Sequence, residues 1–185
     1  MTPGGALLIG LLAFLLDGTE MLALFCAVTA HELGHVLALR LLSCRVDAVS
    51  LTATGPVLHC ASPQLGWRGM LCALSGPAGG ALLWLGLRGL FPLAVEMSFV
   101  LTAVNLLPVL PLDGGRALYA VVMPFPHGAR IVRCVRVVAA AGLFAVGVLC
   151  AVRGWGLAPL LFAVWLLLVP GDSCKTARDV VKYID

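Results

Sequence analysis

Long apolar stretches separated by short polar ones dominate the pattern of this chain. They cover residues 4–16, 20–42, 68–90, 93–107, 129–151 and 155–170. A helix rises about 1.5 Å per residue, so the longer stretches match a bilayer hydrocarbon core of about 30 Å. The stretch 4–16 would span only if the bilayer thins or the helix continues through Asp17 to Glu20. The pattern predicts an all-α polytopic membrane protein with about six transmembrane helices.

A different pattern fills the interval between the second and third apolar stretches. β-Branched residues partly alternate over 46–54, the breaker Gly55-Pro56 follows, and residues 57–59 are again mostly apolar. Such residues favour two short strands around a turn. We therefore expect a small membrane-associated β-hairpin between helices 2 and 3. Two interpretations stay open, a sheet edge that pairs with an extended peptide and a hairpin that only connects helices.

The composition supports the membrane assignment. Of 185 residues, 61% are hydrophobic and 11% charged, whereas soluble domains carry about 25% charged residues. This composition excludes a soluble domain and indicates a protein embedded in a lipid bilayer. It gives no reason to expect a nucleic-acid partner. The seven cysteines contain no C-x-x-C pair, so we expect no disulfide framework. Because no basic residue precedes the run from Ala6 to Leu16, we expect a retained anchor and not a signal peptide.

The basic residues predict the orientation. If the predicted helices alternate in direction, only Arg88 and Arg153 fall on one side of the bilayer. The other side collects Arg40, Arg45, Arg68, Arg116, Arg130, Arg133, Arg136, Lys175, Arg178 and Lys182. The richer side is cytoplasmic by the positive-inside rule. We therefore expect a multi-pass protein, of the bacterial cytoplasmic membrane, with both termini in the cytoplasm.

Three polar residues interrupt the second apolar stretch, in the sequence His31-Glu32-Leu33-Gly34-His35. Residues four apart lie on one face of a helix, so His31 and His35 can bind one metal ion while Glu32 lies beside it. Ionisable residues within a membrane span are costly and indicate a functional site. The positive-inside rule places this cluster in the cytoplasmic half of its helix.

A second polar group follows the fourth apolar stretch, in residues 105–116. Pro108 and Pro111 remove helix donors and Gly114-Gly115 permits unusual backbone conformations, so we expect Asp113 at an irregular turn. Irregular backbone at membrane depth is tolerated where it is buried in protein or lines a wet cavity.

A catalytic zinc ion takes three protein ligands and keeps a fourth position open. Asp113 is the best third ligand beside the two histidines, because Glu20 and Glu96 are expected near the opposite membrane face. We interpret His59 and His127 as polar residues near the membrane surface.

Two further patterns have simpler interpretations. Small residues over 75–80 predict close helix packing, with a local kink at Pro77. Arg130, Arg133 and Arg136 are expected to extend toward anionic head groups, with protein docking as the alternative.

These two motifs, HELGH and N-x-x-P-x-x-P-L-D-G-G, resemble the site-2 protease family of intramembrane zinc metalloproteases. The resemblance covers about residues 21–116 and is closest to the bacterial branch that includes a sporulation protease activating a late sigma factor. It implies that His31, His35 and Asp113 bind Zn²⁺ and that Glu32 is the general base. It also implies that Asn105 helps to hold the substrate backbone.

The chain departs from the family pattern at one motif position. Gly80 stands where the family's G-P-x-x-N pattern has Asn, so a substrate contact from that side chain is in doubt. We also expect no PDZ or CBS domain, and a single protease domain over 1–185 with its catalytic core at about 20–123.

The sequence therefore predicts a zinc endopeptidase that cleaves a transmembrane protein near its cytoplasmic end. Regulated activation of a membrane-tethered transcription or sigma factor is the expected setting, and an inhibitory or regulatory membrane partner is left open. The alternative is a zinc-binding membrane scaffold without proteolysis. A metal permease is disfavoured, because the outer halves of the second and fourth stretches look apolar.

Overall fold

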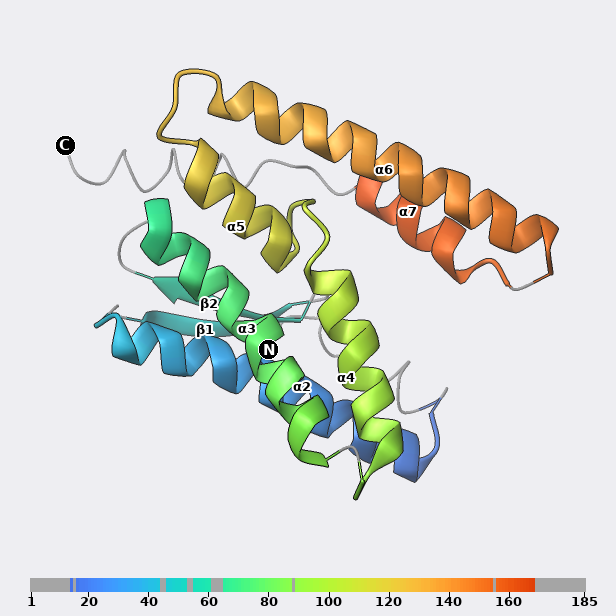
Figure 1. The fold of residues 1–185 in the computed structure, drawn as a ribbon. Helices are drawn as coiled ribbons and strands as arrows, with labels where there is room; N and C mark the ends of the chain where they lie inside the picture. Colours follow the sequence, from blue (N-terminus) through green and yellow to red (C-terminus); the bar gives the residue numbers. More distant parts are fainter. Residues whose placement is uncertain are drawn as a thin grey trace. The chain divides into compact units, whose positions relative to one another are not determined.

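The computed structural model describes residues 14, 16–43, 46–52, 55–60, 65–87, 89–154 and 156–168. Nearly all of the predicted first segment, 4–16, lies outside these residues. The described residues form six helices (Figure 1). They are α2 (Gly18–Leu41), α3 (Gly66–Leu87), α4 (Pro92–Asn105), α5 (Asp113–Val122), α6 (Gly128–Val152) and α7 (Ala158–Leu168).

Five of these helices coincide with predicted apolar stretches, and α5 was not predicted. Three helices of the described chain are long and apolar enough to cross a membrane, namely α2, α3 over Gly66–Gly86 and α6. The helices α4 and α7 have 14 and 11 residues, short of the roughly 20 residues that a spanning helix needs. The chain is thus a multi-pass integral membrane protein, with three candidate spans among its described residues.

The chain divides into two compact units. One comprises residues 1–63 and 71–105, and the other comprises residues 64–70 and 106–185. In the first unit, α2 packs against α4. In the second, α6 packs along α7 and also contacts α5 (Figure 1).

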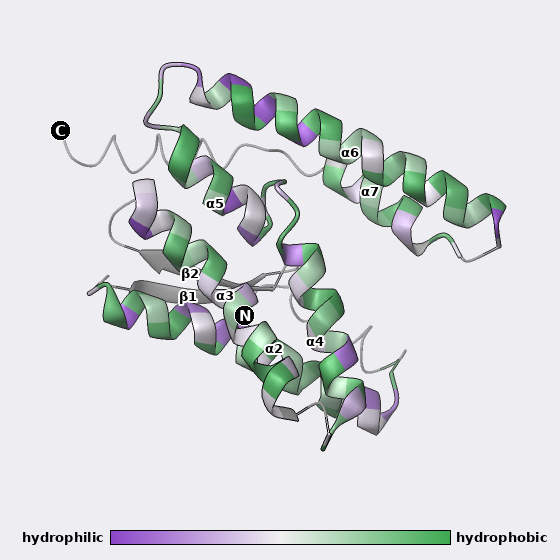
Figure 2. Cartoon of the chain, viewed as in Figure 1, coloured by the Kyte–Doolittle hydropathy of each residue, from purple (hydrophilic) through white to green (hydrophobic). Residues whose placement is uncertain are grey.

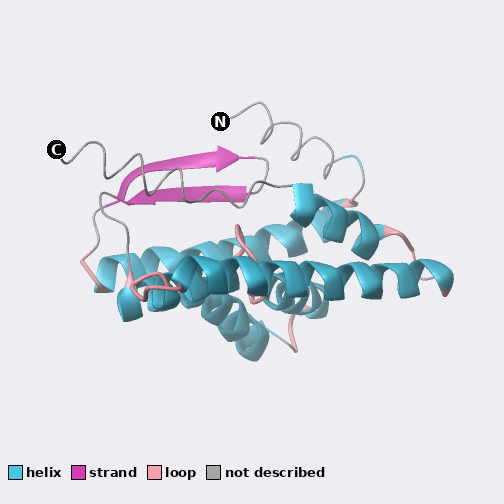
Figure 3. Cartoon of the chain, turned by 90° about the horizontal axis from the view of Figure 1, so that it is seen from above, coloured by secondary structure: helices cyan, strands magenta, loops and turns pink. Residues whose placement is uncertain are grey.

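Two antiparallel strands, β1 (Val46–Thr52) and β2 (Gly55–Cys60), connect α2 to α3 (Figure 3). They occupy the stretch where the sequence pattern predicts strands. Val49 pairs with Leu58, and the register is irregular between Val46 and Ala48. The association of this pair with a membrane stays a prediction.

Two acidic residues, Asp17 and Glu20, cap the start of α2. The Asp17 carboxylate accepts a hydrogen bond from the Glu20 backbone N–H at 2.7 Å, and the Asp17 N–H donates to Glu20 Oε2 at 3.0 Å. This reciprocal capping box satisfies two N–H groups that a helix start leaves unpaired. Asp17 and Glu20 therefore fix where α2 begins.

One face of α2 is buried along its whole length. Its buried residues recur every four positions: Ala23, Ala27, His31, His35 and Leu39. Large apolar side chains such as Phe25, Leu33 and Leu37 are exposed on the other faces. Because the period of four follows one face of a helix, the two histidines point into the protein while the leucines face outward, as expected beside lipid.

The segment between α4 and α5 is irregular, but it ends one residue earlier than the sequence suggested. Asp113 is the first residue of α5, after Leu112 as the N-cap, so the expectation that Asp113 lies at a turn is corrected. A Cβ on Gly114 would overlap the Leu106 carbonyl, and one on Gly115 would overlap the Val109–Leu110 backbone. These glycines thus permit close packing of α5 on the preceding loop; neither has a positive φ.

Candidate metal and catalytic site

His31 and His35 lie one turn apart on the buried face of α2. Their side chains are 4% and 9% exposed, and their ring centroids are 5.0 Å apart in an edge-to-face arrangement. Two imidazoles buried within a candidate membrane span are costly unless a function requires them. The predicted pairing of the two histidines on one helix face is confirmed.

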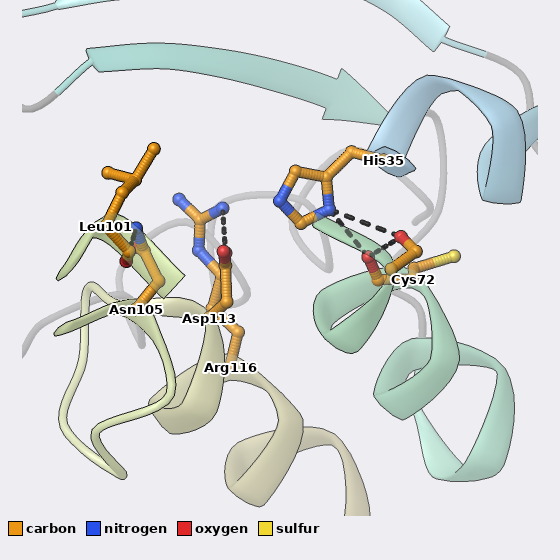
Figure 4. Close-up of polar contacts among 7 residues, drawn as sticks. His35, Cys72, Leu101, Asn105, Asp113 and Arg116 are labelled. Carbon is orange, nitrogen blue, oxygen red and sulfur yellow. Dashed lines mark hydrogen bonds and ion pairs between the residues drawn. The ribbon is translucent and has the colours of Figure 1, made fainter. Parts of the chain in front are cut away.

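A backbone carbonyl of α3 fixes the protonation of His35. His35 Nδ1 lies 2.8 Å from the Cys72 carbonyl oxygen (Figure 4). Because a carbonyl only accepts hydrogen bonds, Nδ1 carries the hydrogen and donates it. The lone pair of the neutral ring is then on Nε2, which is the usual arrangement of a metal-binding histidine with an outer partner.

Gly76 lets both imidazoles approach the backbone of α3. A Cβ built on Gly76 would overlap His35 Nε2 and lie 2.7 Å from His31 Nε2. Both nitrogens therefore approach one point on α3 where the chain carries no side chain. Two imidazole nitrogens that converge in this way can act as ligands of one metal ion.

The other glycines of this contact explain why α2 and α3 approach so closely. A Cβ on Gly34 would overlap the Ser75 carbonyl, and one on Gly79 would overlap the Ala30 carbonyl. The close packing predicted for residues 75–80 is therefore present. Gly76 extends this packing to the two histidine rings.

Asp113 supplies the carboxylate. It is 4% exposed, and its Oδ1 lies 3.6 Å from Arg116 Nη1 (Figure 4). One ligand atom from each of His31, His35 and Asp113 lies within 4.8 Å of the others. Two imidazole nitrogens and one carboxylate oxygen are a typical protein ligand set for a catalytic zinc, so the residues fit the predicted metal.

Glu32 and Asn105 were also predicted to be site residues, but neither belongs to the ligand group. Glu32 follows His31 directly and is half-buried, and it is not part of the ligand group. Asn105 is the last residue of α4, and its Nδ2 donates to the Leu101 carbonyl at 3.0 Å (Figure 4). The roles predicted for both residues stay predictions.

Other polar residues weighed from the sequence take no part in the ligand group of the described residues. His127 is exposed and precedes α6 as its N-cap, and Glu96 is exposed on α4. The side chain of His59 lies outside the described part of the chain.

Sequence reasoning missed the groups that surround His35. The Cys72 carbonyl belongs to the backbone, so no residue type identifies it. Ser75, whose hydroxyl lies 3.4 Å from His35 Nδ1, stood in a motif that was interpreted only as helix packing. Gly76 stood in the same motif, and its proximity to the histidines needs the three-dimensional crossing of α2 and α3.

Gly80, the departure from the family pattern, has a structural explanation. A Cβ there would overlap Thr102 Oγ1 and lie 3.2 Å from Ser98 Oγ, while Ser98 Oγ donates to the Gly80 carbonyl at 2.9 Å. At Gly80, a hydroxyl of α4 therefore bonds directly to the backbone of α3. A larger residue at this position would require the Thr102 side chain to move.

Comparisons with known proteins show what the chain resembles. Residues 64–149 match the model of peptidase family M50. A candidate zinc metalloprotease of Synechocystis sp. is 31% identical over 115 residues, covering 55% of this chain and 30% of the relative. The chain thus spans less than a third of the curated relative that it matches.

The fold is similar to that of a site-2 protease from Methanocaldococcus jannaschii. The TM-score is 0.63 at 19% sequence identity, over 87% of this chain and 81% of that structure. At this identity the likeness shows a shared fold, and the match of residues 64–149 supports the predicted family resemblance. The narrower resemblance to a sporulation protease stays a prediction.

Proposed function

We propose that this chain belongs to peptidase family M50, whose model matches residues 64–149, and that it is a zinc-dependent endopeptidase that cleaves peptide bonds within the membrane. The observation that carries the proposal is the group formed by His31, His35 and Asp113, two of whose members lie on the buried face of a candidate membrane span. Such a donor set has little value for stability in a bilayer, where buried polar groups are costly. Its value is chemical.

The roles of the ligands follow from their donor atoms. The Nε2 atoms of His31 and His35 and a carboxylate oxygen of Asp113 would hold the ion. A zinc ion in this site supplies Lewis acidity, which acidifies water and polarises a carbonyl group. Arg116, 3.6 Å from Asp113, keeps a positive charge beside the carboxylate and restrains its position.

Glu32 is the general base of the proposal. Its carboxylate accepts a proton from the attacking water and returns it to the amine that leaves when the peptide bond breaks. Its position directly after His31, half-buried on α2, supports this role, because a carboxylate within a candidate span has no stabilising reason to be there. Glu32 is thus the catalytic residue, and it binds no metal.

The substrate is a membrane protein that presents an extended segment near the cytoplasmic side. A helix hides its carbonyl groups in internal hydrogen bonds, so cleavage requires local unwinding. In this proposal the Asn105 side chain would hold the unwound backbone, and an edge of the strand pair β1–β2 would pair with it. Regulated release of a membrane-tethered transcription or sigma factor would fit, in a single protease domain with both termini cytoplasmic.

Replacing Glu32 tests this function. Glu32→Gln should lower cleavage of a co-expressed membrane substrate by about 10²–10⁴-fold, the usual contribution of a general base, and it should retain zinc. Glu96→Gln is the matched control, because Glu96 is an exposed glutamate on α4, and it should cleave normally. Comparing membrane proteomes of cells carrying each form should reveal shortened proteins that are missing with Glu32→Gln.

A zinc-binding scaffold predicts the opposite outcome. Glu32→Gln and the unmodified chain would then have the same cellular effect at equal zinc content, and no protein would be shortened in either. That result would overturn the proposed peptidase.

A further inference from the structure

The Ser75 hydroxyl, the Cys72 carbonyl and the His35 ring lie in contact with one another. Ser75 Oγ donates to the Cys72 carbonyl at 2.7 Å, and the same carbonyl accepts from His35 Nδ1 at 2.8 Å. Ser75 Oγ also lies 3.4 Å from His35 Nδ1. The imidazole N–H therefore faces two oxygen atoms of α3, one from the backbone and one from a hydroxyl whose own hydrogen is already directed to the carbonyl.

The local sequence of α3 favours a distortion of the turn that faces His35. Pro77 lies inside α3 and has no N–H to donate to the carbonyl four residues earlier, that of Ala73, which directly follows Cys72. A serine that bonds to a carbonyl of the preceding turn also tends to bend a helix. Both features act on the turn of α3 that contains the Cys72 carbonyl.

We propose that Ser75 is a positioning residue that, through the Cys72 carbonyl, holds His35 in the Nδ1–H form with Nε2 directed at the space beside Gly76. An unconstrained histidine side chain in water favours the other tautomer, with hydrogen on Nε2, which would block metal binding through that atom. Ser75 neither binds metal nor touches substrate in this proposal. The inference rests on the proposed metal site, but it does not require that the site cleaves peptides.

The experiment measures zinc affinity by competition with a chelator, in purified protein in detergent. Ser75→Ala should weaken zinc binding by about 10–100-fold, as loss of an outer partner of a metal-binding histidine typically does. Ser75→Thr keeps the hydroxyl and should restore binding.

The matched control is Ser98→Ala. Ser98 is fully buried, and its hydroxyl also donates to a carbonyl of α3, that of Gly80, at 2.9 Å. Its removal should lower the unfolding temperature and leave zinc affinity unchanged. A general loosening of α3 would instead weaken zinc binding in both variants, and that result would overturn a specific role for Ser75.

Nitrogen NMR of the zinc-free protein provides a second readout that needs no variant to fold well. His35 in the unmodified chain should carry its hydrogen on Nδ1, and in Ser75→Ala the population with hydrogen on Nε2 should rise. An Nε2–H tautomer in the unmodified chain, or unchanged zinc affinity in folded Ser75→Ala, would overturn the proposal. Neither result depends on proteolysis, so failure of the proposed peptidase would be seen separately, as zinc binding without cleavage.

Discussion

The helices α2 and α6 have nearly equal length, 24 and 25 residues, yet they are built for different surroundings. In the most apolar part of α2, 28% of residues are buried in the protein, against 11% in α6. The helix α6 is also the more hydrophobic, and almost all of its length beyond its arginines is apolar (Figure 2). The more hydrophobic helix, α6, thus exposes most of its apolar residues. The less hydrophobic helix, α2, carries the two histidines of the candidate metal site.

The difference lies in how each helix uses its small residues. In α2 and in the part of α3 that meets it, glycines bring two backbones together around a pair of histidines. In α6, Gly142 has open space at its Cβ position, and Gly147 contacts α7 at Leu160. Close backbone approach therefore builds part of the candidate metal site between α2 and α3. Between α6 and α7 it only packs two helices together. Adding one methyl group at each glycine would test this contrast.

The largest effect is expected at Gly76. Gly76→Ala would place a methyl group against both imidazoles, and overpacking of this kind costs about 1–3 kcal/mol. If that cost falls on the bound state, zinc affinity should drop by about 10–100-fold, measured by chelator competition.

Gly142→Ala is the control for Gly76→Ala. Nothing lies within 4 Å of its Cβ position, so zinc affinity should not change, and the unfolding temperature should stay equal or rise slightly because alanine favours helix. Zinc binding by Gly76→Ala equal to that of Gly142→Ala would show that the space beside Gly76 is not a metal site.

An intermediate effect is expected at Gly147. A Cβ there would lie 2.6 Å from the Leu160 Cα, so Gly147→Ala should destabilise the contact of α6 with α7 by about 1–3 kcal/mol. Thermal unfolding in detergent measures this loss. Zinc affinity of the folded variant should remain normal, because the ligand group contains no residue of α6 or α7; a parallel loss of zinc would contradict the separation of packing from chemistry.

The smallest effect is expected at the start of α2. Asp17→Ala removes the side-chain half of the capping box, which should cost about 1 kcal/mol. The first turn of α2 lies more than two turns before His31, so zinc content and cleavage should be preserved. Asp17→Asn, which can still accept the Glu20 N–H, should recover most of the stability. Equal stability of the alanine and asparagine forms would show that the cap contributes little.

The sequence predicted the elements that depend on a long apolar period. The helices α2, α3, α4, α6 and α7 follow directly from it, and the strand pair falls where β-branched residues surround Gly55-Pro56. The short helix α5 escaped prediction because its ten residues begin with Asp-Gly-Gly after two prolines, a composition typical of a loop. Its tertiary packing decided otherwise, since Gly114 and Gly115 allow the helix to lie on its own preceding loop.

The candidate site was predictable to the extent that its chemistry belongs to side chains. His31, His35 and Asp113 were identified from residue type and spacing alone. The carbonyl of Cys72 was not, because every residue carries one, and Gly76 was not, because the value of a missing side chain depends on what faces it. Three helices of the described residues are long enough to span, because apolar stretches predict hydrophobic surroundings and do not give the length of the helix within them.

Zinc content tests the central claim most directly. After removal of metal with a chelator and reloading, the unmodified chain and Glu32→Gln should each bind about one zinc ion, as expected for a single catalytic site. His35→Leu and Asp113→Asn should bind far less under the same conditions while remaining folded. Full zinc content in folded His35→Leu or Asp113→Asn would contradict the account, because the metal would then be held elsewhere.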